Sequence, residues 1–342
     1  MVPEAFREAY TAARQRAGII DRADRARIVV SGRDRASYLH GLLTNDITAL
    51  KPGEGCYAAY LTPQGRMITD LWVYELGDVM LLALGAAEKE TLVAKLDQFL
   101  FSEDVQLGDV TGTFVSLAIV GPEAARIVGS ALEDAPASEL VTLPEHGNRR
   151  ARFAGQPAIV LRVTDTGEPG FEILVDASQS DALLAALRAS GAMDIDRAVA
   201  EALRIEAAIP RFRRDMDEDT IPLEAGIESR AISLTKGCYV GQEVIIRVLH
   251  RGHGRVARKL AGLTFDGEIV PADGATVVAV DPVKAVDREV GRTTSGSMSP
   301  VLERPIALAY LHRDFLAPGT HVSVNGVGGV VTALPFVERP ES

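Results

Sequence analysis

One cysteine lies in a short stretch whose residue types could support thiol chemistry. Cys238 stands between Gly237 and Gly241, with Lys236 two residues before it and Glu243 five residues after it. The glycines allow a tight bend that a residue with a Cβ resists, so we expect a loop here rather than a regular element. A nearby ammonium group favours the thiolate, which is the nucleophilic and metal-binding form of cysteine. A small buried cysteine that packs as a hydrophobe is an equally good interpretation of these residues.

The charge and the cysteine content of the chain exclude several classes of protein. The 342 residues carry a net charge of −11, whereas general binding of nucleic acid or of a membrane surface usually requires a basic excess. Two cysteines, Cys56 and Cys238, indicate a reducing compartment and are too few for the four thiolates that usually hold an iron–sulfur cluster. No stretch approaches the ~20 apolar residues of a membrane helix, and the N-terminus does not look like a secretory signal. We therefore expect a cytoplasmic protein without a membrane partner.

Basic side chains gather just after the Cys238 stretch. No acidic residue occurs between Val244 and Leu260, which creates a local excess of positive charge in an acidic chain. Such a segment could hold an anionic ligand group, or it could be a solvated linker. His250 and His253 interleave with the cations, but two histidines without further ligands fall short of a metal site, so we predict no metal. The cations are Arg247, Arg251, Arg255, Arg258 and Lys259.

The hydrophobic patterns before this segment predict two α+β units. Alternating apolar residues indicate strands, and apolar residues spaced three and four apart indicate helices. Each unit contains a strand hairpin followed by a helix, so we expect a pair of related α/β domains with antiparallel sheets. The expected elements are a helix over 4–17, a strand over 27–30, a helix carrying residues 38–43, strands over 57–61, 68–75 and 78–84, a helix over 92–100, a strand over 114–120, a helix from 121, strands over 158–164 and 171–175, and helices over 180–189 and 196–207.

The last part of the chain has a different pattern. Short strands alternate with turns rich in Gly, Pro and Asp, which predicts a small all-β barrel or sandwich. The predicted domains are accordingly 1–255, with two interleaved α+β subdomains, and 256–342, the all-β domain. The charged run over 211–219 is interpreted as a solvated loop. The strands expected in the last domain are 259–265, 275–280, 289–294, 306–311, 321–324 and 329–334.

Three segments carry a resemblance to a known family. Residues 236–243, Lys-Gly-Cys-Tyr-Val-Gly-Gln-Glu, resemble the signature of the YgfZ family, the folate-binding iron–sulfur maturation factors. That family belongs to a superfamily that also contains the glycine cleavage T-protein (GcvT), an aminomethyltransferase. Residues 61–66 resemble a YgfZ segment, and residues 167–172 are similar to the T-protein segment in which a glutamate holds the pterin of tetrahydrofolate. The resemblance implies three domains in a ring around a central folate cavity, with a C-terminal β-barrel.

The resemblance also implies roles for individual residues. Cys238 would be the functional thiol, with Lys236 and Gln242 shaping its loop. Glu172 would hold the pterin, because an ionised carboxylate accepts two hydrogen bonds at once. Strand alternation considered alone would instead turn Glu172 outward. The other residues expected at the folate site are Arg204, Asn45, Arg66, Asp70, Tyr239 and Arg247, and the cations near Arg247 are candidates for the glutamyl tail.

Several of these residues also have simple structural interpretations. Asn45 and Asp46 fit a turn that ends a helix, and Arg66 with Asp70 fits a salt bridge at a turn. Arg204 fits a surface ion pair that contributes little stability. Cys56 lies beside the start of a strand without a nearby cation, and we interpret it as structural.

Two differences separate the chain from the T-protein. The T-protein has an aspartate needed for aminomethyl transfer after an asparagine-containing run, whereas residues 84–91 contain neither and Glu90 is their nearest carboxylate. The T-protein also lacks a cysteine in the loop that matches 236–243. We therefore predict a tetrahydrofolate-binding, YgfZ-like protein that assists the assembly or repair of iron–sulfur enzymes, with client or assembly proteins as partners. The alternatives are a folate-dependent aminomethyltransferase that uses Glu90 or Asp70, and a non-enzymatic folate-binding module in which Cys238 only packs.

Overall fold

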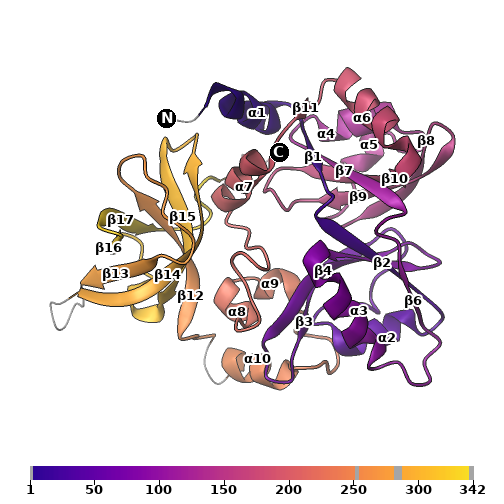
Figure 1. Cartoon of the computed structure of the whole chain (residues 1–342). Coiled ribbons are helices and arrows are strands. Elements are labelled where there is room, and N and C mark those ends of the chain that lie inside the picture. Colours follow the sequence, from indigo (N-terminus) through magenta and orange to yellow (C-terminus); the bar gives the residue numbers. More distant parts are fainter. Residues whose placement is uncertain (1–2, 251–253, 281–286, 339–342) are drawn as a thin grey trace.

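The computed structural model describes residues 3–250, 254–280 and 287–338, and these residues form two open sheets and one closed barrel (Figure 1). The two sheets lie on one side of the molecule and the barrel lies on the other. Segments that run from α7 (Arg197–Glu206) to α10 (Gln242–His250) lie between them. This architecture confirms the predicted fold class, which is α+β with two related domains and a C-terminal all-β barrel.

The first sheet is built from the early part of the chain, and all its pairs are antiparallel. Two helices, α2 (Arg35–Leu42) and α3 (Lys89–Asp97), pack against it because Leu39, Leu92 and Leu96 belong to the same buried apolar cluster as its strands. Full burial of each such side chain stabilises the fold by roughly 1.5–3 kcal/mol. The strand order is β3 (Gly55–Leu61), β4 (Met67–Glu75), β5 (Met80–Gly85), β2 (Arg25–Ser31) and β6 (Gln106–Asp109).

The second sheet has its own helical layer and is connected to the first at an early crossing. It packs against the helices α4 (Ala124–Ala131), α5 (Ala137–Leu140) and α6 (Ser180–Ala189). Its first strand in the chain, β1, lies here, whereas the next strand, β2, lies in the other sheet. The chain therefore crosses between the sheets at residues 22–24. The strand order is β11 (Met193–Asp194), β1 (Gly18–Asp21), β7 (Phe114–Val120), β10 (Gly170–Asp176), β9 (Gln156–Val163) and β8 (Asn148–Phe153), in which only the β1–β11 pair is parallel.

The barrel closes through six strands around an apolar core. A register shift between Thr293 and Ser295 interrupts the pairing of β14 with β15. Such a bulge changes the direction in which side chains point. Here the hydroxyls of the consecutive residues Thr294 and Ser295 both donate to one acceptor outside the barrel, the carboxylate of Asp215. The first strand starts at Arg258, and the predicted domain boundary at 255/256 stays a prediction. The strand order is β12 (Arg258–Phe265), β15 (Arg304–His312), β14 (Asp287–Ser299), β13 (Thr276–Val280), β16 (His321–Val324) and β17 (Val327–Thr332).

The connecting segments differ from the sequence-based expectation in two places. Residues 211–219 are not a fully solvated loop, because Phe212, Asp215 and Met216 are buried. The Cys238 loop runs directly into α10, a helix that the glycine-flanked stretch of β-branched residues did not suggest. Two short helices, α8 (Pro222–Ala225) and α9 (Glu228–Ala231), precede the loop. Among the described residues, no helix is both long and apolar enough to cross a membrane.

Candidate functional site

A central cavity of about 270 Å³ lies where the two sheets meet the connecting segments. The strands β3 and β4 contribute Tyr57, Asp70 and Trp72 to its wall. The crossing between the sheets contributes Arg22 and Arg25. Asp165, from the turn before β10, and residues 209–213, after α7, also line the cavity. The cavity is therefore a mixed surface, with an aromatic wall on one side and paired charges on the others.

Asp70 is a buried carboxylate on the aromatic wall. It is 7% exposed and accepts a hydrogen bond from the Tyr57 hydroxyl at 2.7 Å. Burial raises the pKa of Asp70, and the Tyr57 hydrogen bond and the Arg25 charge offset this effect only in part. The Tyr57 ring in turn lies 5.3 Å from the Trp72 ring, centroid to centroid. A carboxyl group with a raised pKa is suited to holding or accepting a proton during a reaction.

Asp165 is a second carboxylate of the wall, and two arginines hold it in the ionised form. Arg22 Nη2 donates to Asp165 Oδ1 at 2.6 Å, and Arg25 Nη2 donates to Oδ2 at 2.8 Å. Burial would raise the pKa of Asp165, but the charges of Arg22 and Arg25 outweigh burial and hold the pKa at about 2. The Arg25 guanidinium also lies 4.2 Å from the centroid of the Trp72 ring, a cation–π contact. The cavity thus contains one carboxylate, Asp165, that is ionised at neutral pH beside another, Asp70, that takes up a proton more easily.

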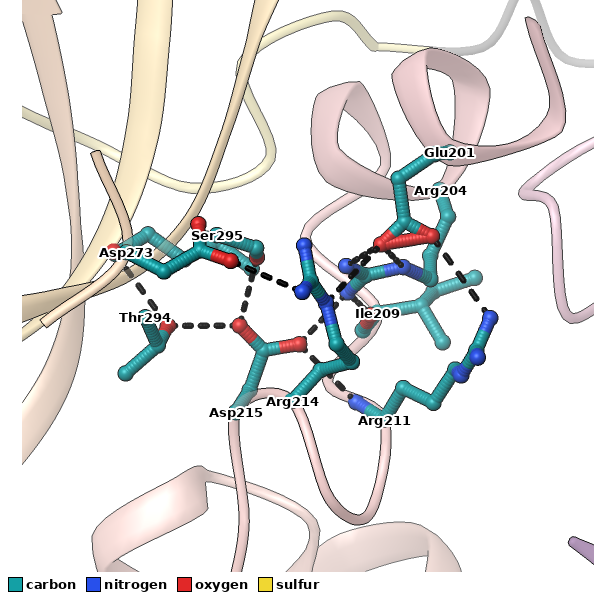
Figure 2. Close-up of polar contacts among 10 residues, drawn as sticks. Glu201, Arg204, Ile209, Arg211, Arg214, Asp215, Asp273, Thr294 and Ser295 are labelled. Atoms are coloured by element: carbon teal, nitrogen blue, oxygen red, sulfur yellow. Dashed lines mark hydrogen bonds and ion pairs between the residues drawn. The ribbon is translucent and has the colours of Figure 1, made fainter. Parts of the chain in front are cut away.

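A buried ionic network joins the cavity wall to the barrel (Figure 2). Asp215 Oδ2 accepts from Arg204 Nη1 at 2.6 Å and from the Arg211 backbone N–H at 3.1 Å. Its Oδ1 accepts from the hydroxyls of Thr294 at 2.5 Å and Ser295 at 2.6 Å, both on β14. Asp215 therefore fixes the wall segment that follows α7 to the barrel, although it does not line the cavity.

The same wall segment is held at a second point in an uncommon backbone conformation. Arg213 has a φ of +66°, a left-handed conformation that a residue with a Cβ adopts only at a cost in energy. Its guanidinium makes two hydrogen bonds of 2.9 Å to the buried carboxylate of Glu88, in η1 (Ala86–Glu88). The bidentate pair offsets the backbone strain and fixes residues 209–213 against the first sheet.

Glu172, the predicted pterin carboxylate, is buried on β10 but is not among the residues that line the cavity. Its Oε1 accepts from the Ser116 hydroxyl at 2.5 Å and forms an ion pair with Arg27. Burial would raise the pKa of Glu172, but the charges of Arg27 and Arg22 lower it below the ordinary value. The carboxylate that the structure presents to the cavity from this region is Asp165, seven residues earlier.

The Cys238 loop lies outside the lining of the central cavity. The thiol is exposed and free, so it is not the small buried cysteine that the sequence equally allowed. Lys236 Nζ is turned toward the C-terminal end of α2, where it donates to the backbone carbonyls of Leu43 at 2.6 Å, Asn45 at 3.0 Å and His40. Burial lowers the pKa of Lys236 to about 8. The lysine thus caps a helix and fixes the base of the loop.

Gly241 closes the Cys238 loop where no other residue fits. Its φ is +83°, and a Cβ at this position would lie 2.5 Å from the backbone oxygen of Thr62. Gln242 follows as the first residue of α10. The loop is therefore packed tightly at both ends, and the thiol projects between them.

The remaining predicted site residues are spread over the molecule. Arg204 and Asp70 line the cavity, whereas Asn45 donates from Nδ2 to the backbone carbonyls of Tyr57 at 2.9 Å and Arg230 at 3.1 Å, behind the wall. The other three lie elsewhere: Tyr239 in an apolar cluster, Arg66 in an exposed pair with Asp219, and Arg247 exposed on α10. No observation here tests their predicted roles, which stay predictions.

The structure describes part of the basic segment that follows the Cys238 loop, and it also describes Cys56. Arg258 pairs with Glu224 at 3.2 Å, and Arg251 and His253 lie outside the described residues. Among the residues that the structure does describe, no group of three metal-ligating side chains gathers. Burial raises the pKa of Cys56 to about 12, which agrees with its interpretation as structural.

Sequence reasoning missed the residues that give the cavity its chemistry, namely Arg22, Arg25, Tyr57, Trp72 and Asp165. Arg25 and Asp165 are 140 residues apart in the chain, and their contact depends on the crossing between the sheets. The available signal was weak. Asp165 stands in the turn that precedes the folate-like segment, but a charged residue in a turn is ordinarily solvated.

Two family models match the chain. The model described as the GCVT N-terminal domain matches residues 2–236, and the one described as the glycine cleavage T-protein C-terminal barrel domain matches residues 258–340. Together these matches extend over both open sheets, the connecting segments as far as residue 236, and the barrel, whereas Cys238 and α10 lie between the two matched ranges.

The chain is also similar to named proteins and to a protein of known structure. The aminomethyltransferase of Streptomyces coelicolor is 32% identical, over 97% of this chain and 90% of its own length. The aminomethyltransferase of Rubrobacter xylanophilus is 33% identical, over 96% of this chain and 86% of its own length. The crystal structure of glycine cleavage system aminomethyltransferase T from Bartonella henselae superposes with a TM-score of 0.85 at 25% identity, over 97% of this chain and 89% of that one.

Proposed function

Because this chain belongs to the family of the glycine cleavage T-protein, we propose that its central cavity binds tetrahydrofolate or a related folate and that the protein transfers a one-carbon, aminomethyl group to it. The observation that carries the proposal is a buried carboxyl group with a raised pKa, Asp70, in a cavity with an aromatic wall. The similar proteins named above are aminomethyltransferases, which favours this function over the iron–sulfur role predicted first. A cytoplasmic location remains part of the proposal.

The residues present suit a reduced pteridine. The cavity, at about 270 Å³, is close to the lower end of the roughly 300–1,000 Å³ typical of ligand pockets. Trp72 and Tyr57 offer an aromatic surface for the ring system. Each oxygen of Asp165 accepts one arginine N–H, and a carboxylate has about four acceptor positions, so Asp165 can also accept from the amino and N–H donors of a pterin.

Asp70 supplies the acid–base group for the transfer. A bound tetrahydrofolate would supply the nitrogen atoms that take up the methylene carbon of a thiol-bound aminomethyl donor, with the donor's amine leaving as ammonia and its sulfur as the free thiol. Tyr57 orients the Asp70 carboxyl through its 2.7 Å hydrogen bond, and burial keeps competing water away from it. Because its pKa is raised, Asp70 holds a proton, or removes one from the reacting amine, closer to neutral pH than an ordinary aspartate.

The alternative carboxylate considered from the sequence, Glu90, is poorly placed for this role. Its side chain is 88% exposed and lies 3.5 Å from Lys89 Nζ on the outside of α3. Glu90 does not line the cavity. Asp70 is therefore the better of the two candidates for the transfer reaction.

The first test compares these two carboxylates. Purified protein is assayed for transfer from a thiol-bound aminomethyl donor to tetrahydrofolate, with substrate binding measured separately. Asp70→Asn should reduce kcat by about 10²–10⁴-fold, the usual contribution of a general acid or base. Glu90→Gln is the matched control and should retain activity. Absence of turnover by the wild-type protein, with folate bound, would contradict the transferase function and leave the non-enzymatic folate-binding module.

The exposed thiol favours a second candidate function. Cys238 projects from a loop that Lys236 and Gly241 hold in place, outside the cavity, where a protein partner can reach it. This geometry supports the YgfZ-like role, in which the folate-bound protein engages an iron–sulfur client or assembly protein through the thiol. Cys238→Ala separates the two functions in the same assays. If the thiol is functional, the variant loses support of iron–sulfur enzyme activity in cells but keeps folate binding, and unchanged support would exclude the thiol.

A further inference from the structure

A histidine at the end of α2 lies beside the Cys238 loop. Lys236 Nζ donates to the backbone carbonyl of His40, which joins the loop to the last turn of α2. A Cβ at Gly237 would lie 3.9 Å from His40 Nε2, so this nitrogen faces the residue that precedes Cys238. The Cys238 side chain is exposed and can change rotamer toward Nε2. An imidazole and a free thiol are therefore neighbours on one surface of the molecule.

Asp46 fixes the orientation of the His40 ring. Its Oδ1 lies 3.2 Å from His40 Nδ1, and it also accepts from the Thr48 hydroxyl at 3.0 Å and from the Ala49 backbone N–H at 3.1 Å. Burial would raise the pKa of Asp46, but the hydrogen bonds from Thr48 and Ala49 lower it below the ordinary value. Among the described residues, the hydrogen-bond partners of the ring are all at Nδ1. An ionised carboxylate there favours the tautomer in which Nδ1 carries the hydrogen and Nε2 is an acceptor.

His40, rather than Lys236, is suited to take a proton from the thiol. An ammonium group has three donors, and those of Lys236 all go to backbone carbonyls at the end of α2. Burial and the Lys236 charge lower the pKa of His40 below its ordinary value, and Asp46 offsets this effect only in part. The imidazole is therefore neutral at neutral pH, which is the form that acts as a general base.

We propose that Cys238 and His40 form a second reactive site, with Asp46 as its positioning residue, and that its substrate is a disulfide of a protein partner. The S–H bond of Cys238 breaks and its proton goes to His40 Nε2. The electron pair left on the sulfur attacks one sulfur of the disulfide, so a mixed disulfide forms and the partner's other sulfur leaves as a thiolate. That thiolate then takes the proton from His40.

This chemistry deepens the second candidate function, on which it rests for the identity of the partner. It makes the thiol a nucleophile in exchange with a partner's sulfur, rather than a ligand of a metal. One thiolate and one imidazole do not complete a metal site, and no group of three metal-ligating side chains gathers among the described residues. The exposed position of the thiol allows a macromolecular disulfide to reach it.

The pH dependence of the site follows from the groups that surround His40. Asp46 comes from the turn after α2, and Lys236 comes from the Cys238 loop. The Cys56 thiol of β3 interacts with Lys236 and Asp46, but burial raises its pKa to about 12, so it stays protonated. Burial lowers the pKa of Lys236 to about 8, so this lysine loses its charge in mildly alkaline solution. A comparison of variants that all keep Lys236 removes its contribution.

The test measures the rate at which the purified protein reacts with dithiodipyridine, a small uncharged disulfide. An unassisted thiol with a pKa of about 8.5 reacts about thirtyfold faster at pH ~9.5 than at pH ~7, because its thiolate fraction rises. The wild-type protein should gain less than about threefold over this range, since His40 assists at the lower pH. His40→Gln should gain about thirtyfold, with a rate about tenfold below wild type at pH ~7 and equal to it at pH ~9.5. Cys238→Ala gives the background rate of Cys56.

The matched control is His312→Gln, which should keep the pH dependence of the wild-type protein. His312 Nδ1 also lies near an aspartate, 3.4 Å from Asp314 Oδ2, but at the end of β15 in the barrel. A rate that falls by the same factor at every pH in His40→Gln would assign a structural role to His40 and overturn the proposal.

The wild-type profile decides the question even if His40→Gln does not fold, because a thirtyfold gain in the wild-type protein would also overturn the proposal. Either negative result would leave the second candidate function standing, provided that Cys238→Ala still loses support of iron–sulfur enzymes in cells. Folate binding and one-carbon transfer in the central cavity are separate measurements, and none of these outcomes changes them.

Discussion

Two irregular segments of the molecule are held in place by different means. The cavity wall, residues 209–216, is fixed by ion pairs with Arg204 of α7, Glu88 of η1 and Asp273 before β13, and by hydroxyl groups of β14. The thiol loop, residues 236–241, is fixed by a single ammonium group that donates to backbone carbonyls at the end of α2. The charged side chains of the wall are therefore paired with other charged side chains, whereas the ammonium group of the loop interacts with the dipoles of backbone carbonyl groups.

This difference indicates which chemical groups each segment can offer to a ligand or a partner. Buried charges are stable only when they are paired, so the wall can expose guanidinium and carboxylate groups to a ligand at fixed positions. The thiol loop carries no such network, and its one reactive group faces solvent. The wall is suited to bind and orient a small molecule, and the loop is suited to meet a larger partner.

The largest effect is expected in the wall. Asp215→Asn removes a charged partner of Arg204 from a buried pair and should lower the free energy of unfolding by about 4 kcal/mol, because Arg204 then keeps Glu201 as its one charged partner among the described residues. Denaturation in urea measures this loss. Asp219→Asn, at an exposed aspartate just beyond the wall segment, is the control and should change stability by less than about 0.5 kcal/mol. Similar stabilities for the two variants would show that the wall does not depend on the buried pair.

A smaller effect is expected in the thiol loop. Lys236→Met removes three hydrogen bonds to the carbonyls at the end of α2, and we expect a loss of about 2 kcal/mol, since removal of the buried charge offsets part of the cost. The same unfolding experiment applies. Lys259→Met, at a half-exposed lysine 3.8 Å from Glu228, should be nearly neutral and serves as the control. A loss equal to that of Asp215→Asn would remove the distinction between the two segments.

A third prediction concerns how the stability that Asp165 contributes depends on pH. The pKa of Asp165 is lowered from 3.8 to about 2 in the folded protein, so its contribution is fully present above about pH 5 and is lost as the pH falls through 2. This contribution is about 2–3 kcal/mol, from a shift of just under two pKa units at about 1.4 kcal/mol each. The stability difference between the wild-type protein and Asp165→Asn should therefore shrink between pH 5 and ~2. A difference that is constant over this range would mean that Arg22 and Arg25 do not hold the carboxylate.

Much of the fold could be predicted from local patterns. The strand expected over 114–120 and the helix expected over 180–189 coincide with β7 and α6, because their apolar residues repeat at the period of each element. The strands β1 and β8 were missed, since one has four residues and the other contains three arginines. The helix α10 was missed because β-branched residues and a preceding glycine favour other conformations.

The candidate site was predicted less completely. The glycines around Cys238 indicated a bend but left the exposure of the thiol open, and Asp70 and Arg204, which were expected at the folate site, line the cavity. The resemblance pointed to Glu172, but Arg27 and Ser116 engage that carboxylate behind the wall. The structure brings Asp165 to the cavity instead, with two arginines from a crossing that no local pattern reveals.

Local sequence was sufficient to indicate the fold class, the all-β C-terminal domain and the bend that carries the thiol, because each depends on the spacing of residues close together in the chain. The tertiary structure determined which carboxylates face the cavity and which charged side chains are paired. Such pairs form between residues more than a hundred positions apart, and their pKa values follow from burial and from neighbours that only the folded protein brings together.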